Sequence, residues 1–162
     1  MTVNENIQIR NELFEAVGEL SNDQLNKKVN ENQWSIMQVL DHLYLMEAGL
    51  VKIMNKTFKT GTSEEISDKP IQLTLDRSRK FNAPNYFVPT NDFVTLEEMK
   101  QKLTSSRNAL HTFVEETKDN NLEDKGFPHP AFGQMKLKQW IPFIGLHEKR
   151  HLEQIYDIKN QL

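Results

Sequence analysis

The sequence contains no cysteine among its 162 residues. Disulfide bonds, thiolate metal ligands and a cysteine nucleophile are therefore excluded. The chain also lacks an apolar run of about 18 residues, the length that would predict a transmembrane helix. Its first six residues, MTVNEN, lack the basic-then-apolar order of a secretion signal. We therefore expect a cytoplasmic protein that does not bind a membrane.

An excess of basic charge is also missing. The chain has 20 Lys and Arg against 23 Asp and Glu, which gives a net charge of −3. No basic stripe interleaved with aromatic side chains is present, although nucleic-acid-binding proteins usually carry one. Nucleic acid is therefore not an expected partner. A chain of this length is expected to form a single domain, residues 1–162, with its own hydrophobic core.

Four segments show the apolar spacing of amphipathic helices. They cover residues 4–20, from Ser35 to about 59–61, from Thr95 to 118–120, and 138–161, with Pro142 placed in the first turn of the last helix. Thr95 and Glu98 form a capping-box pattern. No segment alternates like a strand, so the sequence predicts an all-α fold, a four-helix bundle. On the first helix, the residues expected to face the core are Ile7, Leu13, Phe14, Val17 and Leu20.

The segment 60–94 is too long for a tight hairpin between helices. Pro70, Pro84 and Pro89 argue against a further helix within it. A crossover of this length would allow the second and third helices to run parallel. Long loops in compact domains often carry function. The apolar residues that we expect to pack over the helices are Ile71, Leu73, Leu75, Phe81, Tyr86, Phe87 and Phe93.

Three histidines occupy positions that helical phase assigns to the core. His147 and His151 are four residues apart, so both imidazoles can reach one metal ion. They continue an inward stripe that includes Trp140 and Ile155, and His42 takes a matching place on the second helix. Three buried imidazoles are costly unless they are paired or bound. We therefore predict that His42, His147 and His151 bind one divalent metal ion.

Other polar residues have weaker claims to a site. His111 lies off the apolar stripe of its helix and His129 lies in a proline-rich turn, so both are expected at the surface or in a loop. Trp34 and Trp140 are interpreted as core anchors. The groups that could orient the imidazoles are Asp41, Glu47, Glu148 and Gln154, although at least half of them are expected to be solvated residues on the outer helix faces.

The segment from His147 to His151 also matches the H-E-x-x-H motif of zinc metallopeptidases, in which the glutamate, here Glu148, is the general base. Such enzymes usually take a third ligand downstream, but only 11 residues follow His151. The third ligand would have to come from upstream, and no sheet is predicted that could bind a peptide. The peptidase interpretation is therefore kept as the weaker alternative, with Glu148 as a possible base.

Several short motifs, taken in order, resemble the DinB-like superfamily, which includes the YfiT-like metal-dependent hydrolases and the bacillithiol and mycothiol transferases. The resemblance implies a four-helix bundle with long crossovers, often homodimeric, that binds a divalent ion through three histidines. These ligands correspond to His42, His147 and His151. The motifs are Trp34-Ser35-Ile36, His42-Leu43, Glu47, Phe132-Gly133 and His147-x-x-x-His151-x-x-Gln154-Ile155.

Three imidazoles leave at least one coordination position open, as in catalytic rather than structural sites. The ion is expected to be zinc or nickel, with iron or manganese as alternatives. It could activate water for hydrolysis of a small molecule, or bind a low-molecular-weight thiol as a thiolate for transfer. A non-catalytic metal-binding or stress-related module is the main alternative to an enzyme.

Overall fold

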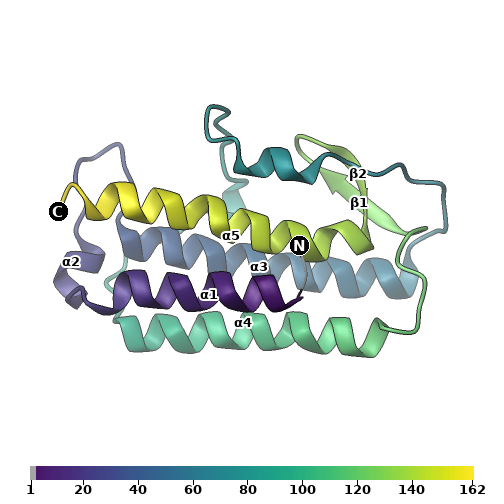
Figure 1. Ribbon diagram of the computed structural model, residues 1–162, viewed down its shortest axis with the longest axis horizontal. Coiled ribbons are helices and arrows are strands. Elements are labelled where there is room, and N and C mark those ends of the chain that lie inside the picture. Colours follow the sequence, from purple (N-terminus) through teal and green to yellow (C-terminus); the bar gives the residue numbers. More distant parts are fainter. Residues whose placement is uncertain (1–2) are drawn as a thin grey trace.

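The computed structural model describes residues 3–162 and is mostly helical (Figure 1). Met1 and Thr2 of the predicted domain lie outside the described residues. Four long helices lie side by side: α1 (Val3–Gly18), α3 (Ile36–Thr60), α4 (Leu96–Thr117) and α5 (Leu137–Lys159). The short elements are helix α2 (Asn22–Asn26), the 3-10 helices η1 (Ile71–Leu75) and η2 (Asn85–Phe87), and strands β1 (Gly126–His129) and β2 (Gly133–Lys136).

Local capping explains where two of the long helices begin. Ser35 and Thr95 each accept a hydrogen bond from the backbone of the residue three positions later, and the side chains of Gln38 and Glu98 accept from the cap in return. These boxes confirm the predicted starts of α3 and α4. Helix α5 begins at Leu137, within one residue of the predicted start. Pro142 is its sixth residue and lies beyond the first turn, in which it was expected.

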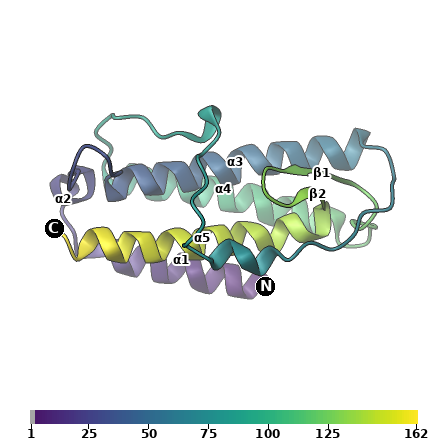
Figure 2. The same cartoon turned by 90° about the horizontal axis from the view of Figure 1, so that it is seen from above.

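The helices α3 and α4 run in the same direction. Residue numbers increase along both helices from one contact to the next, from Asp41 with Lys102 to Phe58 with Phe113. In Figure 2, the crossover between these helices passes over α5 and α3 before it reaches the start of α4. The crossover therefore joins two parallel helices, the arrangement that its length allows. No helix in residues 3–162 has both the length and the apolar character needed to cross a membrane.

The core fills the space between the four long helices. Trp140 is 2% exposed and its indole N–H donates to the carbonyl of Met135, so its predicted role as a core anchor is confirmed. Ile7 was predicted to face the core, but it lies on the outside of α1 and is 40% exposed. Its place on the inner face is taken by Asn6 and Arg10, which are both buried.

Arg10 belongs to a buried cluster of four charged residues, one from each long helix. Its partners in the cluster are Glu47 of α3, Arg107 of α4 and Glu148 of α5. The Nε of Arg10 donates to Glu148 at 2.5 Å, and the Nε of Arg107 donates to Glu47 at 2.8 Å. Each guanidinium also contacts the other carboxylate, at 3.3 Å for Arg10 with Glu47 and 2.5 Å for Arg107 with Glu148. The two positive and two negative charges balance inside the protein.

Burial by itself lowers the pKa of Arg10, but the carboxylates of Glu148 and Glu47 outweigh this effect and hold the pKa above its ordinary value. Each guanidinium also donates to a backbone carbonyl. Arg10 donates to the carbonyl of Leu103, and Arg107 donates to the carbonyl of Asn6. The cluster, defined here as Arg10, Glu47, Arg107 and Glu148, is therefore a satisfied network rather than a set of isolated buried charges.

A β-hairpin precedes α5, and it corrects the expectation that the chain contains no sheet. Strands β1 and β2 pair in antiparallel register, with Phe127 opposite Met135. Each strand has four residues, too few for an alternating pattern to be recognised in the sequence. Gly133 takes a φ of +73° in the turn, and a Cβ on Gly126 would lie 2.2 Å from the carbonyl oxygen of Met135.

The crossover from 61 to 95 contains no α-helix, but the two 3-10 helices within it were not predicted. It is attached to α5 through Arg150, whose guanidinium donates to the backbone carbonyls of Thr74, Asp76 and Arg79. Of the apolar residues of the crossover that could pack over the helices, Ile71 and Phe87 are buried. The other five are at least 38% exposed: Leu73, Leu75, Phe81, Tyr86 and Phe93.

The charged cluster gives a prediction for stability. Replacement of Arg107 by Leu leaves two buried carboxylates with one guanidinium, so we expect the free energy of unfolding to fall by about 3–5 kcal/mol. Arg77→Leu is the matched control, because Arg77 pairs with Asp157 at the surface and such pairs contribute about 1 kcal/mol or less. Urea titration followed by circular dichroism measures both. Equal losses for the two variants would contradict the assigned role of the cluster.

Candidate metal centre

The three predicted histidines come together at the interface of α3 and α5. His42 lies in the second turn of α3 and is 4% exposed, whereas His147 and His151 lie one turn apart on α5 and are partly buried. The antiparallel packing of α3 against α5 brings His42 level with this pair. Helical phase therefore predicted the inward direction of all three side chains correctly.

The ring nitrogens converge on one point. The Nε2 atom of His147 lies 3.2 Å from the Nε2 of His42 and 3.1 Å from the Nε2 of His151. One ligand atom from each histidine falls within 4.8 Å of the other two. Nitrogens bound to one zinc ion at about 2.0–2.1 Å are separated by roughly 3.0–3.4 Å. The spacing of the imidazoles therefore fits a shared divalent ion.

Hydrogen bonds at the outer nitrogens determine which nitrogens face the centre. The Nδ1 of His42 lies 2.8 Å from the carbonyl oxygen of Phe87, and the Nδ1 of His151 lies 2.7 Å from the side-chain oxygen of Gln154. Because each partner is an acceptor, both Nδ1 atoms must carry the proton. The Nε2 atoms of these neutral imidazoles then present lone pairs toward His147, as metal coordination requires.

Burial keeps the imidazoles neutral. It lowers the pKa of His151 to about 3, and His42 adds to this effect. Burial likewise lowers the pKa of His147 well below its ordinary value, with further contributions from His151 and His42. For His42, burial lowers the pKa although the Phe87 carbonyl and Asp41 oppose the shift. Neutral imidazole is the form that binds metal.

Aromatic rings surround the three imidazoles. The ring of Trp34 lies 5.1 Å from that of His42, and the ring of Phe143 lies 5.9 Å from that of His147. Trp34, which was interpreted as a core anchor, is only partly buried and contacts the centre directly. A small cavity of about 10 Å³ lies between His147 and the charged cluster, with Glu47 and Glu148 in its wall. It has room for about one water molecule.

The four residues that were candidates for orienting the imidazoles have different partners in the structure. Gln154 contacts His151 directly, as described above. Glu47 and Glu148 belong to the charged cluster, and Asp41 accepts from Lys102 at 3.2 Å. The three carboxylates are each 8% exposed or less, so the expectation that at least half of these groups are solvated was wrong. The error arose because their ion-pair partners lie on other helices, so the spacing of residues along one helix does not reveal them.

Two further histidines lie outside the centre. His129 ends strand β1 rather than lying in a free turn, and its ring packs 4.8 Å from that of Phe143. Burial lowers the pKa of His129 to about 4. His111, on α4, is partly buried, and its pKa is lowered by burial and by the nearby charge of Arg107. Both residues are thus less exposed than predicted, although neither joins the three converging imidazoles.

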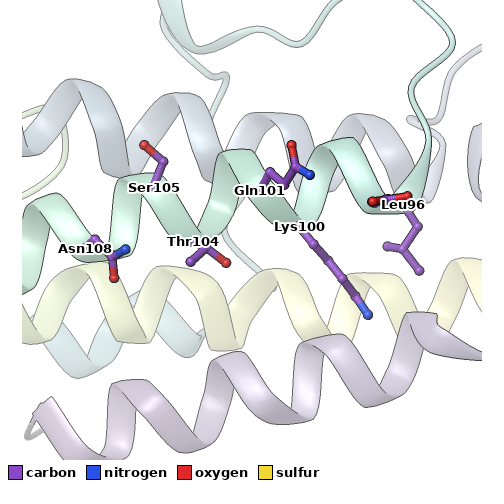
Figure 3. Close-up of a pocket in the computed structure, with 7 residues that line it drawn as sticks. Leu96, Lys100, Gln101, Thr104, Ser105 and Asn108 are labelled. Atoms are coloured by element: carbon purple, nitrogen blue, oxygen red, sulfur yellow. The ribbon is translucent and has the colours of Figure 1, made fainter.

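A second depression lies on the outer face of α4 (Figure 3). It is open and is lined by residues of this helix alone, and the close-up shows Lys100, Thr104 and Asn108 along the lower edge of α4. None of the three converging histidines contributes to it. The chemistry indicated by the donor set is therefore confined to the interface of α3 and α5.

Comparison with known proteins identifies the family of the chain. The family model described as the DinB superfamily matches residues 6–155. The chain belongs to this superfamily. A relative described as uncharacterized protein YuaE, from Bacillus subtilis (strain 168), is 36% identical over 155 residues, which cover 96% of this chain and 95% of the relative. No solved structure gives a significant match. Membership confirms the resemblance seen in the sequence motifs.

The hydrogen bond from His151 to Gln154 predicts an effect on metal affinity. Gln154→Leu removes the acceptor that holds the Nδ1 proton, so we expect zinc affinity to fall about 10–100-fold. Gln161→Leu makes the same chemical change at an exposed position and should leave affinity unchanged. Competition with a chromophoric chelator gives both constants. Wild-type affinity in Gln154→Leu would contradict the orienting role.

The lowered histidine pKa values predict that the metal-free protein loses stability in mild acid. Unfolded histidines take up protons as pH falls below about 6.5, whereas folded His151 stays neutral until about pH 3. The unfolded state therefore binds more protons across this window, and the free energy of unfolding falls with falling pH. Urea midpoints at pH 7.5 and 5.5 measure the change. His151→Gln should reduce the difference, and a constant midpoint in the wild type would refute the prediction.

Proposed function

We propose that the protein is a metal-dependent enzyme, of the thiol-S-transferase or small-molecule hydrolase type, with one divalent ion bound by His42, His147 and His151 in a four-helix bundle. The observation that carries the proposal is the convergence of three Nε2 atoms, two of which have their Nδ1 protons fixed by other acceptors. The lone pairs of His42 and His151 both point toward the Nε2 of His147, an arrangement that suits a cation shared by the three rings. Membership of the DinB superfamily supports the same conclusion.

A three-histidine ligand set leaves a coordination position for water or substrate. A bound ion would supply Lewis acidity, which favours deprotonation of a coordinated water or thiol. The protein's own contribution is to hold the imidazoles neutral and correctly turned, and to surround them with the rings of Trp34 and Phe143. A thiol cosubstrate would bring its own sulfur, which is consistent with a chain that lacks cysteine.

The contacts of Glu148 do not favour the metallopeptidase alternative. One carboxylate oxygen accepts from Arg10, and the other accepts from both Arg10 and Arg107. Glu148 is 2% exposed, and its oxygens are held by the charged cluster. A general base must reach the proton that it abstracts. We therefore assign Glu148 a structural role and name no general base among the protein's side chains.

The ion is proposed to be zinc or nickel, because all-imidazole sites suit both, with iron or manganese as further candidates. The substrate is proposed to be a small molecule, with a low-molecular-weight thiol as one reactant if the reaction is a transfer. We also propose that the protein is cytoplasmic and forms a homodimer. A metal-binding module without catalysis is the second candidate, because the crossover covers His42 almost completely.

The ligand assignment predicts the metal content of variants. His147→Ala or His151→Ala should abolish stoichiometric metal binding, because two imidazoles remain at a site built for three. His111→Ala removes a histidine outside the centre and should retain the metal. Elemental analysis of protein purified without a histidine tag measures the content. Stoichiometric metal in either of the first two variants would show that the ligands are assigned wrongly.

Catalysis is tested separately from binding. We expect the metal-loaded protein to turn over members of a panel that combines low-molecular-weight thiols with electrophiles, together with small ester and amide substrates. Protein with His147 replaced by Ala should be inactive in the same assays. Full metal occupancy without turnover across the panel would favour the binding module over the enzyme.

A further inference from the structure

One metal ligand is oriented by a segment that is distant in the sequence. The acceptor for His151 is Gln154, on the same helix, but the acceptor for His42 is the backbone carbonyl of Phe87, 45 residues away in the crossover. Phe87 is the last residue of η2. The tautomer of His42 therefore depends on where the crossover lies against α3.

The position of Phe87 is determined by a glycine on α3. Gly49 follows His42 by seven residues, so the two lie about 20° apart around the helix axis. A Cβ on Gly49 would lie 2.5 Å from Cε1 and 3.2 Å from Cζ of Phe87. The aromatic ring thus rests on the helix backbone, in the space that any side chain would fill. Phe87 is 6% exposed in this position.

The crossover is also fixed on the other side of His42. The side-chain amide of Gln38 donates to the carbonyl of Thr90 at 3.2 Å and to the side-chain oxygen of Asn91 at 3.0 Å. Gln38, His42 and Gly49 lie on one face of α3. The crossover is therefore held against α3 at Phe87 and again at Thr90 and Asn91. The carbonyl that faces His42 belongs to the first of these contacts.

We propose that Gly49 and Phe87 act as positioning residues for the metal centre: the ring of Phe87, seated against Gly49, places the carbonyl that holds His42 in the Nδ1-protonated form. This inference rests on the proposed metal-binding function and adds that the crossover sets the orientation and tautomer of one ligand. Glycine normally weakens the interior of a helix. Its presence at position 49 is explained by the close approach of the ring.

The test compares Gly49→Ala with Gly18→Ala. An added Cβ displaces the Phe87 ring at position 49 but meets nothing within 4 Å at position 18. We expect Gly49→Ala to lower zinc affinity about 10–100-fold, the usual effect of losing a partner of a ligand, and to alter the visible spectrum of the cobalt-substituted protein. Gly18→Ala should match the wild type. Wild-type affinity and spectrum in Gly49→Ala would overturn the proposal.

A double-mutant cycle separates positioning from general damage to α3. With Phe87 replaced by Ala, the space beside Gly49 is open, so Gly49→Ala should have no further effect on zinc affinity. An equal loss in both backgrounds would overturn the proposal. If Gly49→Ala does not fold, Phe87→Ala alone decides the question. It should weaken zinc binding, and unchanged affinity would count against the positioning role.

The tautomer of His42 in the metal-free protein distinguishes failure of this inference from failure of the proposed function. Nitrogen-15 NMR of the wild type should show His42 protonated on Nδ1, and Gly49→Ala should show a mixture of tautomers. If the wild type binds no metal, the proposed function is wrong, but this measurement still tests the positioning. The same single tautomer in both proteins would overturn it.

Discussion

The buried cluster of Arg10, Glu47, Arg107 and Glu148 is the constraint on which the arrangement of the long helices depends. Apolar side chains allow helices to slide or rotate at small cost, because their contacts are not directional. Four buried charges do not allow this, since each needs its partners at hydrogen-bond distance. The cluster therefore fixes the height and rotation of all four helices at one level.

The candidate metal centre lies directly beside the charged cluster. Glu148 follows His147 in the chain, and Glu47 lies little more than one turn beyond His42 on α3. A shift of either helix that moved the imidazoles apart would also break ion pairs in the cluster. The charges thus hold α3 and α5 in the register at which the three ring nitrogens meet, although none of the charged side chains is among the converging imidazoles.

The sequence predicted the site better than its surroundings. Helical phase is a local property, so the inward direction of His42, His147 and His151 followed from spacing alone. Arg10 was missed because a charged residue within an amphipathic pattern is assigned to the solvent face. Its partners belong to three other helices, and only tertiary structure brings them together. The carbonyl of Phe87 could not have been predicted either, since every residue has a backbone carbonyl.

Arg150 holds the crossover through the backbone carbonyls of Thr74, Asp76 and Arg79, not through their side chains. Attachment of this kind does not depend on which side chains the three residues carry. The exposed side chains of this stretch, such as Leu75 and Arg79, can therefore be exchanged while the path of the chain over α5 is retained. Variation between residues 74 and 79 is thus compatible with an unchanged position of the crossover against the helix that carries His147 and His151.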